Sequence, residues 1–401
     1  MKVQRVEQKV ITHNHPKYKI IDEMSFNSKN LYNEANYVLR QEFINNGNYI
    51  SYYDMNKEFK THENYKACGS QPANCTLRLL DKNWKSYFRA IKDWKEHPEK
   101  YLGMPKLPKY LPKDGRFNWM IPNNQCYFDK EKGEIHFSVL KLQGYHWKSR
   151  CIGRLIQVRF VPRGNNYVME AVYEVEIEDK VNGEMNRVIA IDLGVDNFAT
   201  VTNNIGLNPF IINGKPLKSI NQFYNKRLAK EKSELMKRNG LYWSNKLDSI
   251  NFKRHKRVKD YIHKSSAYIV KWCVKNNIDT IIVGKNKKWK QNKDNMQNFV
   301  FIPYDIFIEQ LEYKCENVGI RFIKVEESYT SGTSFLDNEE PCRDNYNKDR
   351  RIYRGLFESN NGLLINADVN GSYQIMEKVI PNAIDRYGIE AILTPMIINI
   401  I

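Results

Sequence analysis

The chain has 401 residues, and its 63 Lys and Arg side chains exceed the 46 Asp and Glu side chains by 17. Apolar residues make up 41% of the sequence, which suits packed cores and excludes a disordered chain. Aromatic residues add 12%, and a chain this basic and this aromatic suits a polyanion whose bases can stack on it. The alternative is a basic surface that serves only solubility. The length suggests two or three domains.

The sequence favours neither a membrane protein nor a protein stabilised by disulfide bonds. No apolar run approaches the roughly 18 residues of a membrane helix, and the residues from Met1 to Val6 lack the apolar stretch of a signal peptide. We therefore expect a cytoplasmic protein with no membrane partner. The seven cysteines are scattered and include no CxxC pair, which argues against a disulfide framework and against a zinc site built from cysteine pairs.

The first half of the chain changes character three times. Alternating apolar residues predict a strand within 1–20, and apolar residues spaced by three and four predict helices over 23–97. Four prolines and several lysines mark an extended connector at 98–114. Short β-branched and aromatic runs over 115–180 then predict a small barrel or twisted sheet.

The second half alternates apolar strands with helices. The predicted strands include 188–191, 278–283 and 321–325. A long helical region covers 215–276, and a further helix covers 304–318. Such alternation predicts an α/β layer with a buried sheet, so the expected fold class is multidomain α+β.

A basic block lies within the long helical region. Between Lys215 and Lys264 the chain has 15 Lys or Arg and 4 Asp or Glu. These side chains would neutralise phosphates without reading sequence, although a solvated helix hairpin is the alternative. The predicted nucleic-acid contacts in the block are Lys226, Arg227, Lys230, Lys237, Arg238, Lys253, Arg254, Lys256 and Arg257. The polar face of the helix ending before Pro98 adds Lys82, Lys85 and Arg89.

Three acids follow apolar segments of the α/β layer. Asp192 ends one predicted strand, Asp368 precedes a helix, and Glu326 with Glu327 ends another strand. Other interpretations are a turn residue for Asp192, a helix cap for Asp368 and surface acids for the two glutamates. Because the two glutamates would point to opposite faces of the strand, only one of them would face Asp192.

Together these acids fit a phosphodiester cleavage site with two metal ions. Hard divalent ions such as Mg²⁺ bind few carboxylates and keep waters and substrate oxygens as further ligands. A pair of ions about 3.5–4 Å apart activates the attacking water and stabilises the leaving oxygen. We expect Mg²⁺ as the cofactor, with Mn²⁺ as an alternative ion.

Several motifs resemble the TnpB family, the RNA-guided nucleases of insertion sequences that are related to compact type V CRISPR effectors. The motifs are Ile191–Thr200, Asn213–Gln222, Tyr329–Ser331, Asn366–Gly371 and, more weakly, Pro72–Phe88. The resemblance implies an RNase H-like RuvC nuclease domain over 186–401. It also implies a β-barrel wedge domain made of 1–20 and 98–185, with a helical recognition domain, 21–97, inserted into it.

The resemblance further implies partners and site residues. A guide RNA from the transposon end would pair with one strand of target double-stranded DNA, next to a short flanking motif. Asp192 and Asp368 match the first and third acids of the RuvC site. The protein would associate with the nucleoid of a prokaryotic cell when bound to DNA. Both a monomer and a dimer are compatible with the sequence.

Two positions depart from the family pattern. The second acid is expected after 280–283, where this chain has Gly284. From the spacing to Thr330 we predict that Glu327 takes this role, with Glu326 as the second choice. The zinc knuckle is also missing, since only Cys342 lies between Ser331 and Asp368, so we predict no zinc. If neither glutamate reaches the metal, the protein would be a nuclease-dead RNA-guided repressor. A DNA-strand-transfer transposase is a third alternative, but no Tyr or Ser nucleophile motif in this sequence supports it.

Overall fold

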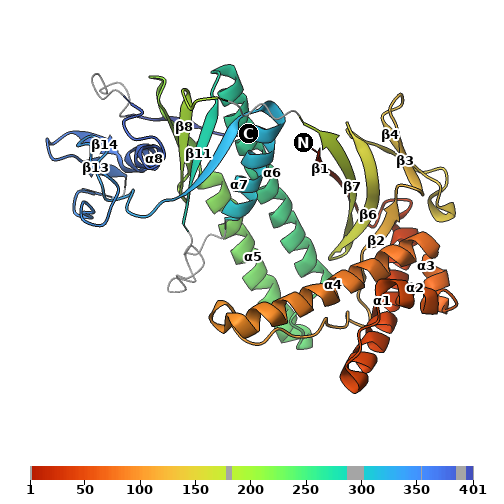
Figure 1. Ribbon diagram of the computed structural model, residues 1–401. Helices are drawn as coiled ribbons and strands as arrows, with labels where there is room; N and C mark the ends of the chain where they lie inside the picture. Colours follow the sequence, from red (N-terminus) through yellow and green to blue (C-terminus); the bar gives the residue numbers. More distant parts are fainter. Residues whose placement is uncertain (1, 178–182, 287–301, 354, 385–393, 401) are drawn as a thin grey trace. The chain divides into compact units, whose positions relative to one another are not determined.

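The computed structural model describes residues 2–177, 183–286, 302–353, 355–384 and 394–400 (Figure 1). The chain divides into two compact units, unit 1 from Met1 to Glu176 and unit 2 from Ile177 to Ile401. Each unit has its own hydrophobic cores. None of the helices in the described ranges is long and apolar enough to cross a membrane.

Unit 1 contains two antiparallel sheets that share a core. The four-stranded sheet has the order β1-β7-β6-β2, and the three-stranded sheet has the order β3-β4-β5. Trp119 and Phe160 from the first sheet pack with Ile135 and Trp147 from the second. Within the described part of unit 1, no ladder joins the two sheets into a closed barrel. The strands are β1 (Lys2–Ile11), β2 (Trp119–Pro122), β3 (Cys126–Asp129), β4 (Glu134–Phe137), β5 (His146–Lys148), β6 (Arg154–Arg163) and β7 (Asn166–Glu176).

Four helices lie between β1 and β2 in the chain. They are α1 (Tyr18–Asn46), α2 (Tyr52–Phe59), α3 (Glu63–Cys68) and α4 (Ser70–Glu96). The predicted helical region is thus confirmed, but it begins earlier than residue 23. The apolar face predicted for α4 is buried, because Leu77, Leu80 and Trp84 are fully enclosed by α1 and its neighbours.

Unit 2 is built on a six-stranded sheet with the order β12-β11-β8-β9-β10-β15. β8, β11 and β12 are parallel, and β9 runs antiparallel to β8. The predicted apolar strands are therefore neighbours at the centre and one edge of the sheet. The strands are β8 (Val188–Leu193), β9 (Asn197–Asn203), β10 (Phe210–Asn213), β11 (Thr280–Lys285), β12 (Arg321–Glu326) and β15 (Met396–Ile398). A separate hairpin contains β13 (Leu356–Glu358) and β14 (Leu364–Asn366).

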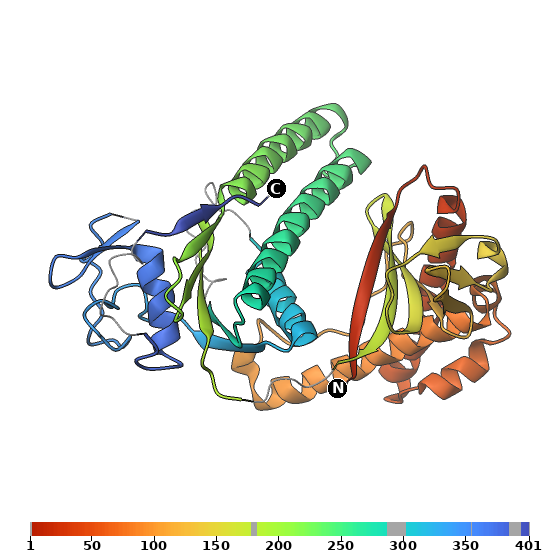
Figure 2. The same ribbon diagram turned by 90° about the horizontal axis from the view of Figure 1, so that it is seen from above.

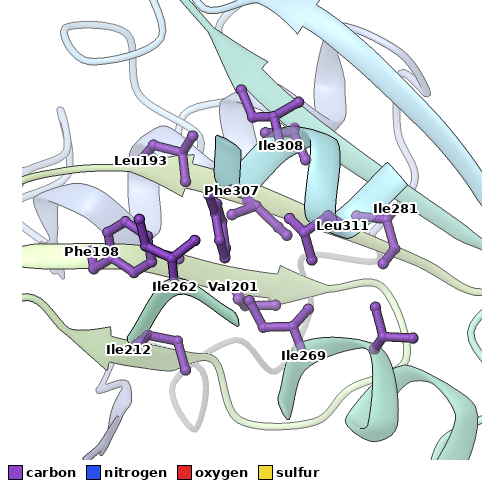
Figure 3. Packing of buried hydrophobic residues seen from close by; sticks show 14 of the residues in the cluster. Leu193, Phe198, Val201, Ile212, Ile262, Ile269, Ile281, Phe307, Ile308 and Leu311 are labelled. Carbon is purple, nitrogen blue, oxygen red and sulfur yellow. The ribbon is translucent and has the colours of Figure 1, made fainter. Parts of the chain in front are cut away.

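Helices cover both faces of this sheet. α6 (Asn245–Lys275) and α7 (Tyr304–Val318) pack on one face, and α8 (Ala367–Glu377) packs on the other (Figure 1). Figure 3 shows the core on the first face, where Leu311 of α7 lies beside Ile281 of β11 and Phe307 of α7 lies beside Phe198 of β9. Helices on both faces require each strand to be apolar on both sides, which explains the continuous apolar runs in the sequence.

The predicted long helical region over 215–276 consists of two helices. α5 (Lys215–Asn239) ends at Gly240, whose φ of 63° suits glycine, and α6 begins after Ser244. The Ser244 hydroxyl accepts a hydrogen bond from the Leu247 N–H at 3.4 Å and so caps α6. The two helices lie side by side (Figure 2).

Candidate active site

The alternation of side chains along β8 directs Asp192 toward α8. Ile189 and Ile191 point into the core beneath α6 and α7, whereas Val188 and Ala190 pack against α8. Asp192 follows Ala190 by two residues and continues the α8-facing series. It pairs with Thr200 of β9 and belongs to the strand, so the alternative of a turn residue is wrong.

Asp368 lies in the first turn of α8 and is not its cap. The Asn366 side chain caps the helix, accepting hydrogen bonds from the N–H groups of Asp368 at 3.0 Å and Val369 at 3.2 Å. The Asp368 carboxylate instead accepts a hydrogen bond from Asn197 Nδ2 at 2.6 Å. The cap role is thus already filled, and the Asp368 carboxylate faces the end of the sheet that carries Asn197.

Glu327 joins these two acids from the end of β12. Ile323 and Val325 pack with α8, so Glu327 continues the α8-facing series and Glu326 belongs to the opposite one. The register pairs Val325 with Gly284, and a Cβ added to Gly284 would lie only 3.2 Å from Glu327 Oε2. The carboxylate of Glu327 therefore lies against the backbone position where the sequence lacks the expected acid.

The carboxylates of Asp368 and Glu327 lie close enough to Asp192 to affect its protonation. Burial, together with the charges of Asp368 and Glu327, raises the pKa of Asp192 to about 8. The positive charge of Arg351 acts in the opposite direction, and its Nη2 lies 3.8 Å from Asp368 Oδ1. A cluster of oxygen donors with this excess of negative charge fits a hard divalent cation such as Mg²⁺.

Neighbouring groups hold α8 and the end of β12 in place. The Ser372 hydroxyl donates to the carbonyl oxygens of Ala190 at 3.0 Å and Thr200 at 3.2 Å. A Cβ on Gly371 would lie 3.1 Å from Asp192 Oδ2, so glycine lets the helix approach the acid. Lys378 Nζ donates to the Glu326 carbonyl oxygen at 2.9 Å, at the point where β12 ends. These contacts fix the position of α8 against β8 and the end of β12.

The predicted basic residues of unit 2 lie on α5 and α6. The two helices enclose a pocket of about 50 Å³, to which both contribute cationic side chains. Arg254 is half-buried there, where it donates to Asn221 Oδ1, and burial lowers its pKa. The predicted residues that line the pocket are Arg227, Lys253, Arg254 and Arg257. The others, Lys226, Lys230, Lys237, Arg238 and Lys256, are exposed.

The three predicted residues of unit 1 are exposed on α4. Lys85 forms an ion pair with Asp81 at 2.8 Å, one helical turn away. Lys82 and Arg89 extend the same polar face of the helix. The structure therefore leaves these side chains accessible, as binding to a polyanion would require.

Comparison with known proteins shows which families this chain resembles. The family described as OrfB_IS605, probable transposase, matches residues 171–290, and the family described as Cas12f1-like, TNB domain, matches residues 304–375. The TnpB-like protein ORF457 of Acidianus two-tailed virus is 24% identical over 393 residues, which cover 88% of this chain and 82% of the relative. The chain is a member of the TnpB family.

A solved structure shows the shared fold. A chain in the cryo-EM structure of the Cas12f1–sgRNA–target DNA complex superposes with a TM-score of 0.55 at 15% sequence identity. The match covers 89% of this chain and 82% of that chain. This TnpB-family protein therefore has a mixed α+β fold like that of the Cas12 effectors.

In the segment where the TnpB pattern places a zinc knuckle, this chain has a network of ion pairs. Arg350 Nη1 lies 2.7 and 2.8 Å from the two carboxylate oxygens of Glu339 and 3.8 Å from Asp337 Oδ2. Glu339 also accepts a hydrogen bond from the Ser334 N–H at 2.8 Å, and Arg350 Nη2 donates to Asn360 at 2.7 Å. Charged side chains thus hold together the loop between β12 and α8.

Three residues at the site of this TnpB-family protein were not identified from the sequence. Asn197 lies in a motif that carried the resemblance, but no pattern showed that its amide would contact Asp368. Arg351 lies in a loop without periodicity, so its approach to Asp368 had no sequence signal. Lys378 had none either, because it reaches back from the end of α8 to β12.

Proposed function

We propose that this chain is an RNA-guided DNA endonuclease that cleaves target DNA next to a short flanking motif. The observation that carries the proposal is the convergence of Asp192, Glu327 and Asp368 on the α8 side of the sheet, with the pKa of Asp192 raised to about 8. A structural role offers no reason to gather acids that destabilise one another. Such a cluster is typical of sites that trade stability for function.

Asp192, Glu327 and Asp368 would hold two Mg²⁺ ions, and Mn²⁺ would fit the same oxygen ligands. When bound, the ions would activate the attacking water and stabilise the leaving oxygen of the phosphodiester. The chain's own residues position the ligands. Asn197 orients the Asp368 carboxylate through its hydrogen bond, and Lys378 fixes the strand end from which Glu327 projects.

The cationic side chains of α5 and α6 would bind the backbone of the guide–target heteroduplex. Arg227 and Arg257 contribute to the pocket from opposite helices, so a phosphate in the pocket would contact both. Phosphate contacts give affinity and register without reading sequence, which suits a protein whose specificity comes from base pairing. Lys82, Lys85 and Arg89 would add contacts from unit 1.

The domain assignment is part of the proposal. Residues 186–401 would form the RuvC nuclease domain with an RNase H-like sheet. Residues 1–20 and 98–185 would form the barrel-type wedge domain, and 21–97 the inserted recognition domain. The Cas12f1 complex contains an sgRNA and a target DNA. By analogy, the partners of this chain would be a guide RNA from the transposon end and double-stranded DNA.

A plasmid cleavage assay tests this function. We would copurify the protein with its RNA, sequence that RNA, and supply a plasmid with a matching target behind a library of flanking sequences. The expected result is cleavage in Mg²⁺ that EDTA and Asp368→Asn both abolish, with DNA binding retained in the variant. Stable RNA-dependent binding without cleavage in any divalent ion would instead indicate a nuclease-dead repressor.

The choice of glutamate is tested in the same assay. Glu327→Gln is expected to reduce the cleavage rate by at least about 10²-fold, because it removes a metal ligand. Glu326→Gln is the matched control, since it changes the adjacent residue in the same way, and it should stay within a few-fold of the parent rate. The reverse order would show that Glu326 is the ligand.

A further inference from the structure

One face of the β3–β4–β5 sheet gathers side chains that bind transition metals. In the antiparallel register His136 lies opposite His146 on β5, and Asp129 on β3 lies opposite Glu134. Because neighbouring residues of a strand alternate between faces, these four side chains share one face. The intervening residues Ile135 and Trp147 are buried in the core behind the sheet.

The ligand atoms on this face are close together. One such atom from each of Glu134, His136 and His146 lies within 4.8 Å of the other two. His136 Nε2 is 3.8 Å from Asp129 Oδ2 and 3.8 Å from Glu134 Oε2. Neighbouring ligands of a tetrahedral ion with bonds of 2.0–2.1 Å are about 3.4 Å apart. Small side-chain rotations would bring the cluster to that spacing.

The polar atoms of this cluster are incompletely satisfied. His136 Nε2 is buried and has no hydrogen-bond partner within the ranges that the structure describes. Asp129 Oδ1 is engaged by the N–H groups of Glu131 at 3.0 Å and Lys132 at 3.1 Å, which leaves Oδ2 on the side of His136. The Lys132 ammonium is 4.0 Å from Oδ2 and is exposed, so it screens this charge only weakly.

The arrangement also places like charges opposite each other. Asp129 and Glu134 form a cross-strand pair, and two carboxylates in that relationship repel. A divalent cation would remove this repulsion and would give the buried nitrogen of His136 a partner. Two imidazoles and one or two carboxylates form a ligand set that suits Zn²⁺ and similar ions better than Mg²⁺.

We propose that Glu134, His136 and His146, with Asp129 as the fourth ligand, bind one transition-metal ion of the Zn²⁺ type. The ligands come from all three strands of the sheet, and those strands have only three or four residues each. The ion would therefore tie together a sheet that is too short to be stable by itself. The sequence led us to predict no zinc in this protein because the knuckle between Ser331 and Asp368 is missing, and the present proposal departs from that prediction on the basis of different ligands in unit 1.

Zn²⁺ titration of the full chain tests the proposal. The protein is stripped with EDTA and titrated calorimetrically in excess Mg²⁺, which occupies sites that prefer hard ions. We expect one saturable equivalent of Zn²⁺ and a rise of several degrees in the melting temperature. His146→Gln changes an exposed side chain and should leave the fold intact, yet it should remove the equivalent and the thermal shift.

Three variants make the result specific. His136→Gln should also lose the equivalent. His97→Gln is the matched control, since His97 Nδ1 lies 3.6 Å from Glu99 Oε1 but belongs to no group of three possible ligands among the residues that the structure describes, and this variant should bind Zn²⁺ like the parent. Asp192→Asn should also bind like the parent, which separates this site from the candidate active site. The proposal fails if the parent shows no saturable Zn²⁺ binding, or if His136→Gln and His146→Gln both retain that binding. A change of stability with pH but not with Zn²⁺ would also overturn it, because it would indicate a protonated imidazole between the carboxylates.

Discussion

Gly284 and Glu327 occupy one small region of the structure, although 43 positions separate 284 from 327. A Cβ on Gly284 would lie 3.2 Å from Glu327 Oε2 and 2.5 Å from Cδ1 of Ile375 in α8. The missing side chain at 284 thus makes room both for the helix and for the glutamate. The glycine at the end of β11 and the glutamate after β12, which we propose as the second acid of the site, therefore depend on the same packing.

This relationship predicts the effect of Gly284→Ala. The new methyl group must displace Ile375 and press on Glu327, so we expect a loss of about 1–3 kcal/mol in stability and slower cleavage. The double variant Gly284→Ala with Ile375→Val removes the clashing Cδ1 and should recover part of the melting temperature. It should not recover cleavage, since Glu327 stays displaced. Full activity in the double variant would show that the Gly284–Glu327 contact is unimportant.

Asp192→Asn should stabilise the metal-free protein while abolishing cleavage. Burial and two neighbouring carboxylates raise the pKa of Asp192 from 3.8 to about 8, so at neutral pH a carboxylate that is ionised in the unfolded chain must take up a proton on folding, which costs stability. The amide is neutral in both states and changes the shape little, so we expect the melting temperature to rise by several degrees in EDTA. Asp196→Asn is the matched control. It breaks an ion pair of 2.9 Å with Lys218 and should give no gain. Equal shifts for the two variants would contradict the proposed strain.

The Arg350 network should be the main stabiliser of the loop between β12 and α8. Arg350→Ala leaves the Glu339 and Asp337 carboxylates without their cation, and we expect a loss of about 3 kcal/mol together with faster proteolysis of this loop. Removing both partners, as Arg350→Met with Glu339→Gln, should cost less than the single change. EDTA should not alter the proteolysis of the parent loop. A single variant as stable as the parent would exclude this role.

The salt dependence of RNA affinity tests whether the pocket between α5 and α6 binds phosphates. Lys253→Gln with Arg257→Gln should weaken RNA binding and lower the slope of log affinity against log salt by roughly two, about one for each lost phosphate contact. Lys271→Gln with Lys275→Gln is matched in charge and lies on the same helix, outside the pocket, so its slope should equal that of the parent. The measurement is RNA affinity over a series of salt concentrations. Equal slopes for both pairs would mean that the pocket binds no phosphate.

Lys314 should make stability increase with pH. Burial lowers its pKa from 10.5 to about 8, and its ammonium donates to the His263 carbonyl oxygen at 2.9 Å. Below pH 8 the folded and unfolded states both carry the charge, so the full cost of burying it is present. Between pH 8 and 10.5 the folded state is already neutral, and the cost disappears as the unfolded state also loses its proton.

Lys314→Met isolates this effect from other groups that titrate at high pH. The free energy of unfolding of the variant, minus that of the parent, should fall as the pH rises through this range. Denaturant unfolding of both proteins at several pH values measures the difference. If the difference between the two free energies of unfolding stays constant with pH, burial does not lower the pKa of Lys314.

The sequence by itself determined the features that depend on local patterns of apolar residues. The apolar face of α4 follows from spacings of three and four residues, and the strands before Asp192 and Glu326 follow from apolar runs; the structure confirms all three. The residues of Ile191–Thr200 and Asn366–Gly371 carried the family resemblance. The position of the break between α5 and α6 was not predicted, because their basic composition continues through Gly240.

Only the tertiary structure decided which polar groups meet. The register of β12 against β11 brings Glu327, and not Glu326, to the α8 side, and one residue of slip would reverse that choice. Asn366, and not Asp368, caps α8 because the backbone at that turn places its side chain against the free N–H groups. His136 and His146 are brought together by the pairing of β4 with β5. Such contacts depend on how distant segments pair and pack, and no local pattern contains that information.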